Sequence, residues 1–278
     1  MGPTVGARYA DIGGLVPQGI SAEMIADKWG LSREDLDRYS AESQRRAAQA
    51  SSEGRFENEI VPVTEKRLDK ETKKLIESDE MLTADEGIRP GTTAETLANL
   101  KPAFKPNGKV TAGNSSQITD GASAVLVMSE DRASALGLTP RARFHAFALA
   151  GADPVMMLTA PIPATQKALT KSGLRIDEIG AFEVNEAFAV QVLAFLEHFG
   201  IADDDARVNP YGGAIAMGHP LASSGVRLMT QLARQFEERP DVRYGLTTMC
   251  IGIGMGGTVI WENPHWVSTS STNEDGAA

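Results

Sequence analysis

The chain has 278 residues, of which 42% are apolar, 23% charged and 6% aromatic, a composition typical of soluble globular proteins and not of disordered, collagen-like or membrane proteins. Because a single core rarely keeps growing beyond about 250 residues, this length favours two lobes. The 27 basic and 37 acidic residues give a net charge of -10, which disfavours binding to nucleic acid or to an anionic membrane surface.

The N-terminal part of the chain is polar, and its pattern predicts loops with a few short elements. Residues 1–20 contain five glycines and two prolines without a helical period, which predicts a loop. Helices are predicted over 21–30 and 33–51, the second beginning after a serine, a residue that caps helix N-termini. The pattern then predicts a short β-like run at 60–63 and a short helix at 93–100.

After Gly113 the pattern changes, because short apolar runs alternate with helical segments, as in a layered α/β core. The predicted strands are 121–128, 142–150, 180–184, 243–250 and 256–262, and the predicted helices are 129–136, 163–172, 187–199 and 223–238. The last two strands flank a short Gly-rich connection that suits a hairpin, so we expect a mixed sheet.

The single cysteine and the lack of long apolar segments indicate the cellular compartment in which the protein is found. One cysteine excludes an intrachain disulfide and a zinc ribbon, and a lone thiol suits a reducing cytosol. No apolar run approaches the roughly 20 residues that a membrane helix needs. The N-terminus also lacks a basic segment followed by an apolar stretch. We therefore expect a cytoplasmic protein that is neither secreted nor inserted into a membrane.

Two residues beside glycines are candidates for chemistry. Cys250 ends an apolar strand and precedes a cluster of glycines, which let backbone N–H groups approach a bound oxyanion. A packed core thiol beside a hairpin is the alternative interpretation. His219 lies between Gly218 and Pro220, in the fixed backbone geometry that a general base or oxyanion donor needs. A loop histidine without a chemical role is its alternative.

Further candidates are polar residues near predicted strand ends and loops. Asn185 follows a predicted strand, where its amide would orient a substrate or a water, or would cap the next helix. Ser116 suits a contact to a ligand's polar arm or a turn. Arg89 and Lys101 are candidate phosphate partners, with a solvated surface position as the alternative. The remaining histidines, His145, His198 and His265, are interpreted as packing or surface residues.

Three long motifs occur in a defined order along the C-terminal half. They are Asn-Glu-Ala-Phe at 185–188, Gly-Gly-Ala-Ile-Ala-Met-Gly-His-Pro at 212–220 and Cys-Ile-Gly-Ile-Gly-Met-Gly at 250–256. In this order they resemble the thiolase family of acyl-CoA acyltransferases. Supporting matches are Thr-Ala-Gly-Asn-Ser-Ser at 111–116 and Pro-Ile-Pro-Ala at 161–164, and the resemblance extends to about Pro264.

The resemblance implies an α/β fold of two similar halves stacked in five layers, α-β-α-β-α, with a loop domain inserted in the first half. Residues 1–113 would be the loop domain, 114–139 the end of the N-terminal half, 140–264 the C-terminal domain with its mixed sheet, and 265–278 a flexible tail. The part of the first half where the family keeps its nucleophilic cysteine would be missing.

This missing part leads to two expectations. The chain by itself should be inactive. The apolar face of the helix at 187–199 should lack cover and cause association; its exposed residues would include Val184, Phe188, Val192 and Phe195.

The family's chemistry can be transferred motif by motif. His219 would activate the nucleophile and, with a water held by Asn185, stabilise the enolate oxygen of the thioester. Cys250 would be the acid and base at the α-carbon, and the Gly252 N–H would form part of the second oxyanion hole. Ser116 and Met157 would line the pantetheine channel, and Arg89 would lie near the nucleotide phosphates. The resemblance implies no metal and no cofactor other than the coenzyme A thioester, which is a substrate.

The implied function is acyl transfer to and from coenzyme A in fatty acid β-oxidation or related lipid metabolism, by a homo-oligomer. Some positions depart from the commonest family pattern, so acyl-chain specificity does not transfer: Pro17-Gln18, Ala222 and Ile253. A non-catalytic protein that binds coenzyme A or lipid would explain the motifs equally well. A ketoacyl synthase is disfavoured, because that class generally needs a second histidine where Cys250 stands.

Overall fold

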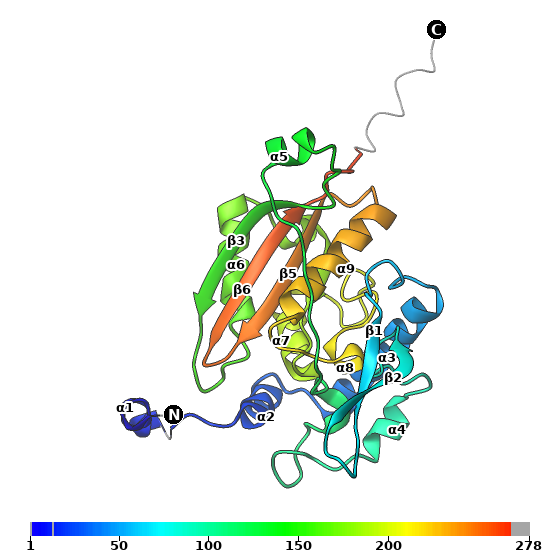
Figure 1. Cartoon of the computed structure of the whole chain (residues 1–278). Coiled ribbons are helices and arrows are strands. Elements are labelled where there is room, and N and C mark those ends of the chain that lie inside the picture. The colour runs from blue at the N-terminus through cyan, green and yellow to red at the C-terminus, as the bar shows by residue number, and fades with distance from the viewer. Residues whose placement is uncertain (1, 13, 268–278) are drawn as a thin grey trace.

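The computed structural model describes residues 2–12 and 14–267 (Figure 1). Its helices are α1 (Pro3–Arg8), α2 (Gln18–Lys28), α3 (Arg33–Ser52), α4 (Ala94–Ala98), α5 (Glu130–Ala135), α6 (Pro161–Ser172), α7 (Ala189–Phe199), α8 (Ala214–Met217) and α9 (Ser224–Glu238). Its strands are β1 (Val63–Leu68), β2 (Leu75–Leu82), β3 (Arg143–Gly151), β4 (Ile179–Val184), β5 (Tyr244–Ile251) and β6 (Met255–Glu262). Three short 3-10 helices are η1 (Ala10–Ile12), η2 (Ala112–Asn114) and η3 (Ile176–Glu178).

The main sheet is mixed, as predicted, with the strand order β3-β6-β5-β4. Only β4 and β5 are parallel, and β5 and β6 form the predicted hairpin. Helix α6 packs on β3 and β6, whereas α9 packs on β4 and β5. These helices cover opposite faces, because successive residues of one strand belong to different core clusters: Ile260 faces the α6 side and Trp261 the α9 side.

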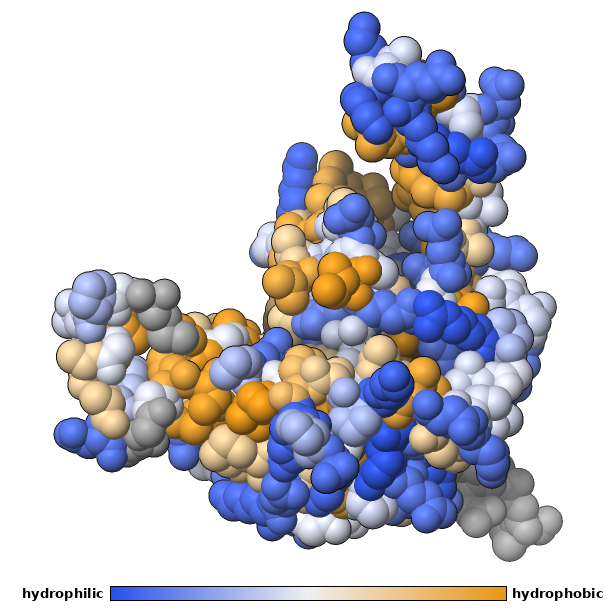
Figure 2. All heavy atoms as spheres, turned by 90° about the horizontal axis from the view of Figure 1, so that it is seen from below, coloured by the Kyte–Doolittle hydropathy of each residue, from blue (hydrophilic) through white to orange (hydrophobic). Residues whose placement is uncertain are grey.

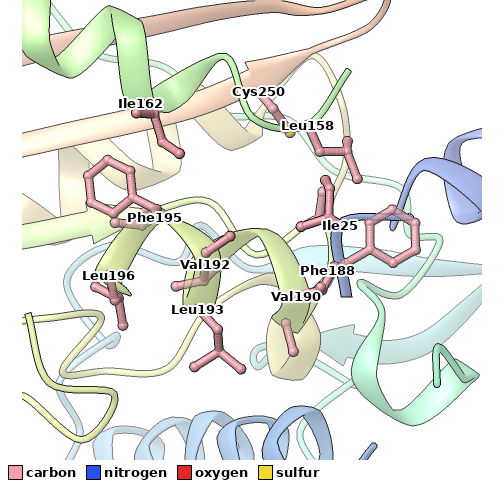
Figure 3. Packing of buried hydrophobic residues seen from close by; sticks show 14 of the residues in the cluster. Ile25, Leu158, Ile162, Phe188, Val190, Val192, Leu193, Phe195, Leu196 and Cys250 are labelled. Atoms are coloured by element: carbon pink, nitrogen blue, oxygen red, sulfur yellow. The ribbon is translucent and has the colours of Figure 1, made fainter. Parts of the chain in front are cut away.

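Helix α7 lies at the centre of the largest core cluster and is apolar almost all round (Figure 3). The expectation that the apolar face here lacks cover is wrong: Val184, at the end of β4, is 2% exposed, and Phe188, Val192 and Phe195 are 7%, 0% and 1% exposed. Helices α2, α3 and α6 all pack against α7, and α2 contributes the fully buried Ile25. The N-terminal helices therefore supply the cover that was expected to be absent.

The exposed apolar surface lies elsewhere. The predicted strand at 121–128 is wrong, because the segment forms no ladder with any described strand. Its apolar residues face solvent: Val125, Leu126 and Val127 are 41%, 79% and 60% exposed. A β-prone sequence becomes a strand only where a neighbour accepts its backbone hydrogen bonds. The edge strand β3 also exposes apolar side chains, Phe144, Phe147 and Leu149.

The N-terminal region differs most from the prediction. Within 1–20, where a loop was predicted, the structure has α1, η1 and the start of α2, and α1 buries no residue. The β-like run at 60–63 overlaps only the first residue of β1, and the β1–β2 hairpin was missed. Figure 2 shows hydrophobic surface gathered beside the N-terminal segment and a second, smaller group above the middle of that face. The predicted tail at 265–278 lies outside the described residues beyond 267.

The remaining predicted elements from 33–51 onward are confirmed to within a few residues, and the short helix α8 was not predicted. In the residues that the structure describes, no helix is long and apolar enough to cross a membrane. The same residues contain no group of three or more His, Cys, Asp or Glu side chains arranged to hold a metal ion.

Candidate active site

Asn185 lies at the carboxyl end of β4, where the strand gives way to the connection before α7. Its backbone N–H donates to the Thr248 carbonyl at 3.0 Å, which extends the parallel pairing with β5 by one residue. The helix-cap alternative is wrong, because the N-cap of α7 is Phe188 and no side chain caps that helix. The Asn185 side chain is therefore available for other contacts, although the residue is only 1% exposed.

His219 lies in the connection between α8 and α9, and its backbone is fixed against the segment at 117–119. Its N–H donates to the Gln117 carbonyl at 3.1 Å. Gly218 has φ +89, and a β-carbon there would lie 2.3 Å from the Thr119 hydroxyl, so only glycine fits. The backbone at Gly218, His219 and Pro220 is thus fixed, as the sequence pattern predicted.

The imidazole of His219 is held at both nitrogens. Nδ1 lies 2.5 Å from the Ser224 hydroxyl, and that hydroxyl donates to the Pro220 carbonyl at 2.9 Å. Since the hydroxyl has a single hydrogen, Nδ1 carries the imidazole hydrogen and Nε2 is left as an acceptor for Asn185 Nδ2 at 3.2 Å. Burial, together with the positive charge of Arg227, lowers the pKa of His219, which favours this neutral form.

Cys250 lies on β5 opposite Gly256 of β6, in the same core cluster as Leu158 and Ile25 (Figure 3). Its thiol donates to the Gln191 side-chain oxygen at 3.8 Å. Burial raises the pKa of this thiol to about 12, so the sulfur keeps its proton at neutral pH.

Gln191 connects the two halves of this arrangement. Its amide nitrogen donates to the Asn185 carbonyl at 2.6 Å, and Asn185 in turn contacts the imidazole. The structure therefore joins Cys250, Gln191, Asn185 and His219 in one buried network. Sequence reasoning missed Gln191, because its residue type and its position in the first turns of an apolar helix carry no chemical signal.

Glu186 was also missed, although it lies inside the first motif. Its carboxylate is completely buried and accepts four hydrogen bonds. The donors are the Tyr39 hydroxyl at 2.9 Å, the Ser43 hydroxyl at 2.8 Å, Asn209 Nδ2 at 3.1 Å and the Ile215 N–H at 3.1 Å. The first two belong to α3 and the last belongs to α8, which precedes His219. Glu186 thus ties the N-terminal region to the imidazole loop.

The other four predicted site residues lie outside the helices and strands. Ser116 is half-buried, and its N–H donates to the Ala187 carbonyl at 3.0 Å. Met157 is 8% exposed in the core, with φ +20. Gly252 begins the exposed β5–β6 turn. Arg89 is exposed, and its N–H donates to Gln44 at 2.8 Å.

A doubly anchored imidazole, connected through Asn185 and Gln191 to a buried protonated thiol at the carboxyl end of a strand in an α/β protein, is suited to acid–base chemistry on an acyl substrate. Two family models match the chain: the thiolase N-terminal domain over residues 10–131 and the thiolase C-terminal domain over residues 138–263. The chain belongs to the thiolase family.

Relatives and solved structures agree with this assignment. The chain is 52% identical over 246 residues to a 3-ketoacyl-CoA thiolase of Photobacterium profundum, covering 88% of this chain and 62% of the relative. It is 46% identical over 262 residues to a 3-ketoacyl-CoA thiolase of Escherichia coli O139:H28, covering 94% of this chain and 65% of the relative. It therefore spans less than two thirds of the length of either relative.

The crystal structure of human mitochondrial 3-ketoacyl-CoA thiolase is similar in fold, with a TM-score of 0.81 and 38% identity over 90% of this chain and 60% of that one. The same human protein has been solved in complex with CoA, with a TM-score of 0.81, 38% identity and coverage of 89% of this chain and 59% of that one.

Proposed function

We propose that this chain carries the acid–base half of a thiolase active site and acts on coenzyme A thioesters. The observation that supports this most directly is the network that joins a protonated Cys250 thiol to a basic His219 Nε2 through Gln191 and Asn185. In thiolysis of a 3-ketoacyl-CoA, a nucleophile takes the acyl group and the bond between the α- and β-carbons breaks. The electron pair then remains on the acetyl-CoA fragment as an enolate, which needs a proton at carbon and stabilisation at oxygen.

Cys250 meets the need for a proton at carbon, and His219, Asn185 and Gly252 meet the need for stabilisation at oxygen. The Cys250 thiol supplies the proton to the α-carbon. His219 Nε2 takes the proton of the nucleophile, and the resulting Nε2–H stabilises the enolate oxygen together with a water held by Asn185. The buried Asn185 Oδ1 has no partner among the described residues, so it is free to accept a hydrogen bond from such a water. The Gly252 N–H in the neighbouring turn contributes to the second oxyanion hole.

The substrate's carrier arm is assigned to the surrounding residues. Ser116 and Met157 line the pantetheine channel, and Arg89 lies near the nucleotide phosphates. The proposal includes a cytoplasmic location, a homo-oligomer and a division of the chain into the ranges 1–113, 114–139, 140–264 and 265–278. It includes no metal and no cofactor, because coenzyme A takes part as a substrate. The CoA complex of the human relative supports the choice of ligand.

The nucleophile is not assigned to this chain. Cys250 is its single cysteine, and that thiol holds its proton. Loss of the nucleophile in a covalent mechanism lowers the rate by about a million-fold, so we expect no thiolysis above background from this chain alone. Robust turnover of a 3-ketoacyl-CoA by the isolated chain would contradict this assignment.

The acid–base half is tested by a reaction that needs no nucleophile. The small thiolate fraction of Cys250 takes the α-hydrogen, exchanges it with solvent and returns deuterium to the carbon. We therefore expect the chain to exchange a methyl hydrogen of acetyl-CoA for deuterium in D₂O at a rate that rises with pH, followed by NMR or mass spectrometry. Cys250→Ala should abolish the exchange, and Asn185→Ala should reduce it. His198→Ala serves as a control, because His198 is exposed and, among the described residues, its side chain forms a hydrogen bond only with Gln166 at 2.9 Å.

The same experiment separates the proposal from its alternative. Calorimetry with coenzyme A measures binding independently of exchange. Binding without exchange would indicate a non-catalytic protein that binds coenzyme A. Absence of both would contradict a role in coenzyme A chemistry for this chain.

A further inference from the structure

Gln191 is a buried polar residue on an otherwise apolar helix. It is 4% exposed, and the other described residues of α7 up to Leu196 are aliphatic or aromatic and buried. A buried amide costs free energy unless its donor and its acceptor both find partners. Gln191 has both: the Asn185 carbonyl at 2.6 Å and the Cys250 sulfur at 3.8 Å.

The orientation of this amide is fixed by its neighbours. A backbone carbonyl only accepts, so the Gln191 atom that faces the Asn185 carbonyl must be the NH₂ group. The other end of the amide, Oε1, therefore faces the Cys250 sulfur. Because Oε1 only accepts, the sulfur has to be the donor, and the thiol is the protonated partner in this contact.

We infer that Gln191 is a positioning residue that keeps the proton on Cys250 and fixes the sulfur relative to Asn185. The use of this proton in catalysis rests on the proposed function, whereas its location on the Cys250 sulfur does not. The negative end of the amide dipole at the sulfur disfavours a thiolate there, and the hydrogen bond favours the thiol. A residue that only filled space at this position would do neither.

The test uses the fact that Cys250 is the only cysteine in the chain. The rate of alkylation by iodoacetamide, followed by mass spectrometry across a pH series, reports the thiolate fraction of this one residue. Gln191→Met removes the acceptor at similar volume and should lower the thiol pKa, so alkylation at a fixed pH becomes about threefold to tenfold faster. At the alkaline end of the series, where the new buried carboxyl ionises, Gln191→Glu adds negative charge beside the sulfur and should slow alkylation by a similar factor.

The control is Gln44→Met on α3. Gln44 is 5% exposed and, like Gln191, donates one hydrogen bond and accepts one, but it does not contact Cys250. Opposite shifts for the two Gln191 variants, with none for the control, support the inference. Faster alkylation in both Gln191 variants would mean that the substitutions only loosen the core, and no change in either would mean that Gln191 does not affect the thiol. Either result overturns the inference.

A second measurement covers the case in which Gln191→Glu fails to fold. The S–H stretching band in the Raman spectrum arises from Cys250 alone, and it should move to higher wavenumber in Gln191→Met as the hydrogen bond is lost. An unmoved band would overturn the inference. Neither readout requires turnover, so a chain without deuterium exchange but with these shifts would contradict the proposed function and leave the role of Gln191 intact.

Discussion

Replacing Glu186 by glutamine should destabilise the protein far more than the small change in shape suggests. A carboxamide has one acceptor oxygen, whereas the carboxylate uses both of its oxygens, each for two donors. The new NH₂ group would face one of these pairs. The hydroxyls of Tyr39 and Ser43 are able to turn and accept from it, but the N–H donors of Asn209 and Ile215 are not.

The loss in the free energy of unfolding follows from the number of donors that lose their acceptor. In either amide orientation, one N–H donor faces another donor. An unpaired Ile215 N–H would cost about 1–3 kcal/mol, whereas Asn209 Nδ2 would lose one bond and keep the Val184 carbonyl at 2.8 Å. The remaining hydrogen bonds also lose their charge assistance, although a neutral amide is less costly to bury than a carboxylate. We expect a loss of about 3 kcal/mol in the free energy of unfolding, which corresponds to a melting temperature lower by about 10 °C.

The matched control is Glu183→Gln, two residues before the motif. Glu183 is also completely buried, but it accepts only one hydrogen bond, from Gln235 at 2.6 Å, and its other oxygen has no partner among the described residues. Burial raises the pKa of Glu183 well above the ordinary value, which favours the neutral carboxyl in the folded protein. We expect a change of less than about 1 kcal/mol.

The pH dependence of the control has a definite sign. A carboxyl whose folded pKa is raised loses its stabilising protonated form as the pH rises from the ordinary value of 4.5 toward the folded value. The Glu183→Gln variant should therefore gain stability relative to the parent chain as the pH rises through that window. Thermal and urea denaturation at several pH values measure both substitutions. Equal losses at Glu183 and Glu186 would refute the argument that donor number decides the cost.

Three further substitutions test other parts of the fold and site. Ile253, at φ +62 in the β5–β6 turn, should be replaced by glycine with a gain of about 1 kcal/mol in urea denaturation, whereas Ile251→Gly in the adjoining strand should lose a similar amount. Ser224→Ala removes the acceptor of the imidazole Nδ1–H; it should populate the other tautomer in ¹⁵N NMR and slow deuterium exchange about tenfold. Phe195→Ala should cost about 3–5 kcal/mol, because the ring is 1% exposed. The exposed Phe147→Ala should cost less than about 1 kcal/mol.

Features with local causes were predictable from the sequence. The helix at 33–51 begins where Ser32 and Asp35 form a capping box, with hydrogen bonds of 2.8 and 3.1 Å between residues three apart. The mixed sheet followed from apolar runs and a short turn. The candidate chemistry at His219 and Cys250 was recognised because glycines and a proline constrain the backbone within one or two residues of each.

Features with distant causes were not predictable. The segment 121–128 has strand propensity, but whether it forms a strand depends on a neighbour that its own sequence does not specify. The β1–β2 hairpin is exposed on both faces, so it lacks the alternation that identifies a half-buried strand. Gln191 and Glu186 act on residues that are 59 and up to 147 positions away in the chain, and only the folded structure shows these contacts.

Four successive residues of the first motif each contact a different part of the chain. Asn185 turns its amide to the imidazole, and Glu186 binds α3 and the loops before α9. The Ala187 carbonyl accepts from the Ser116 N–H, and the Phe188 ring packs edge-on against Phe104 at 6.0 Å. Asn185 and Glu186 directly follow β4, and their side chains contact different parts of the chain, so the residue proposed for chemistry is adjacent to the residue that docks α3. The motif therefore couples assembly of the N-terminal region to the position of the amide, and a change that weakens the Glu186 contacts is expected to displace Asn185 as well.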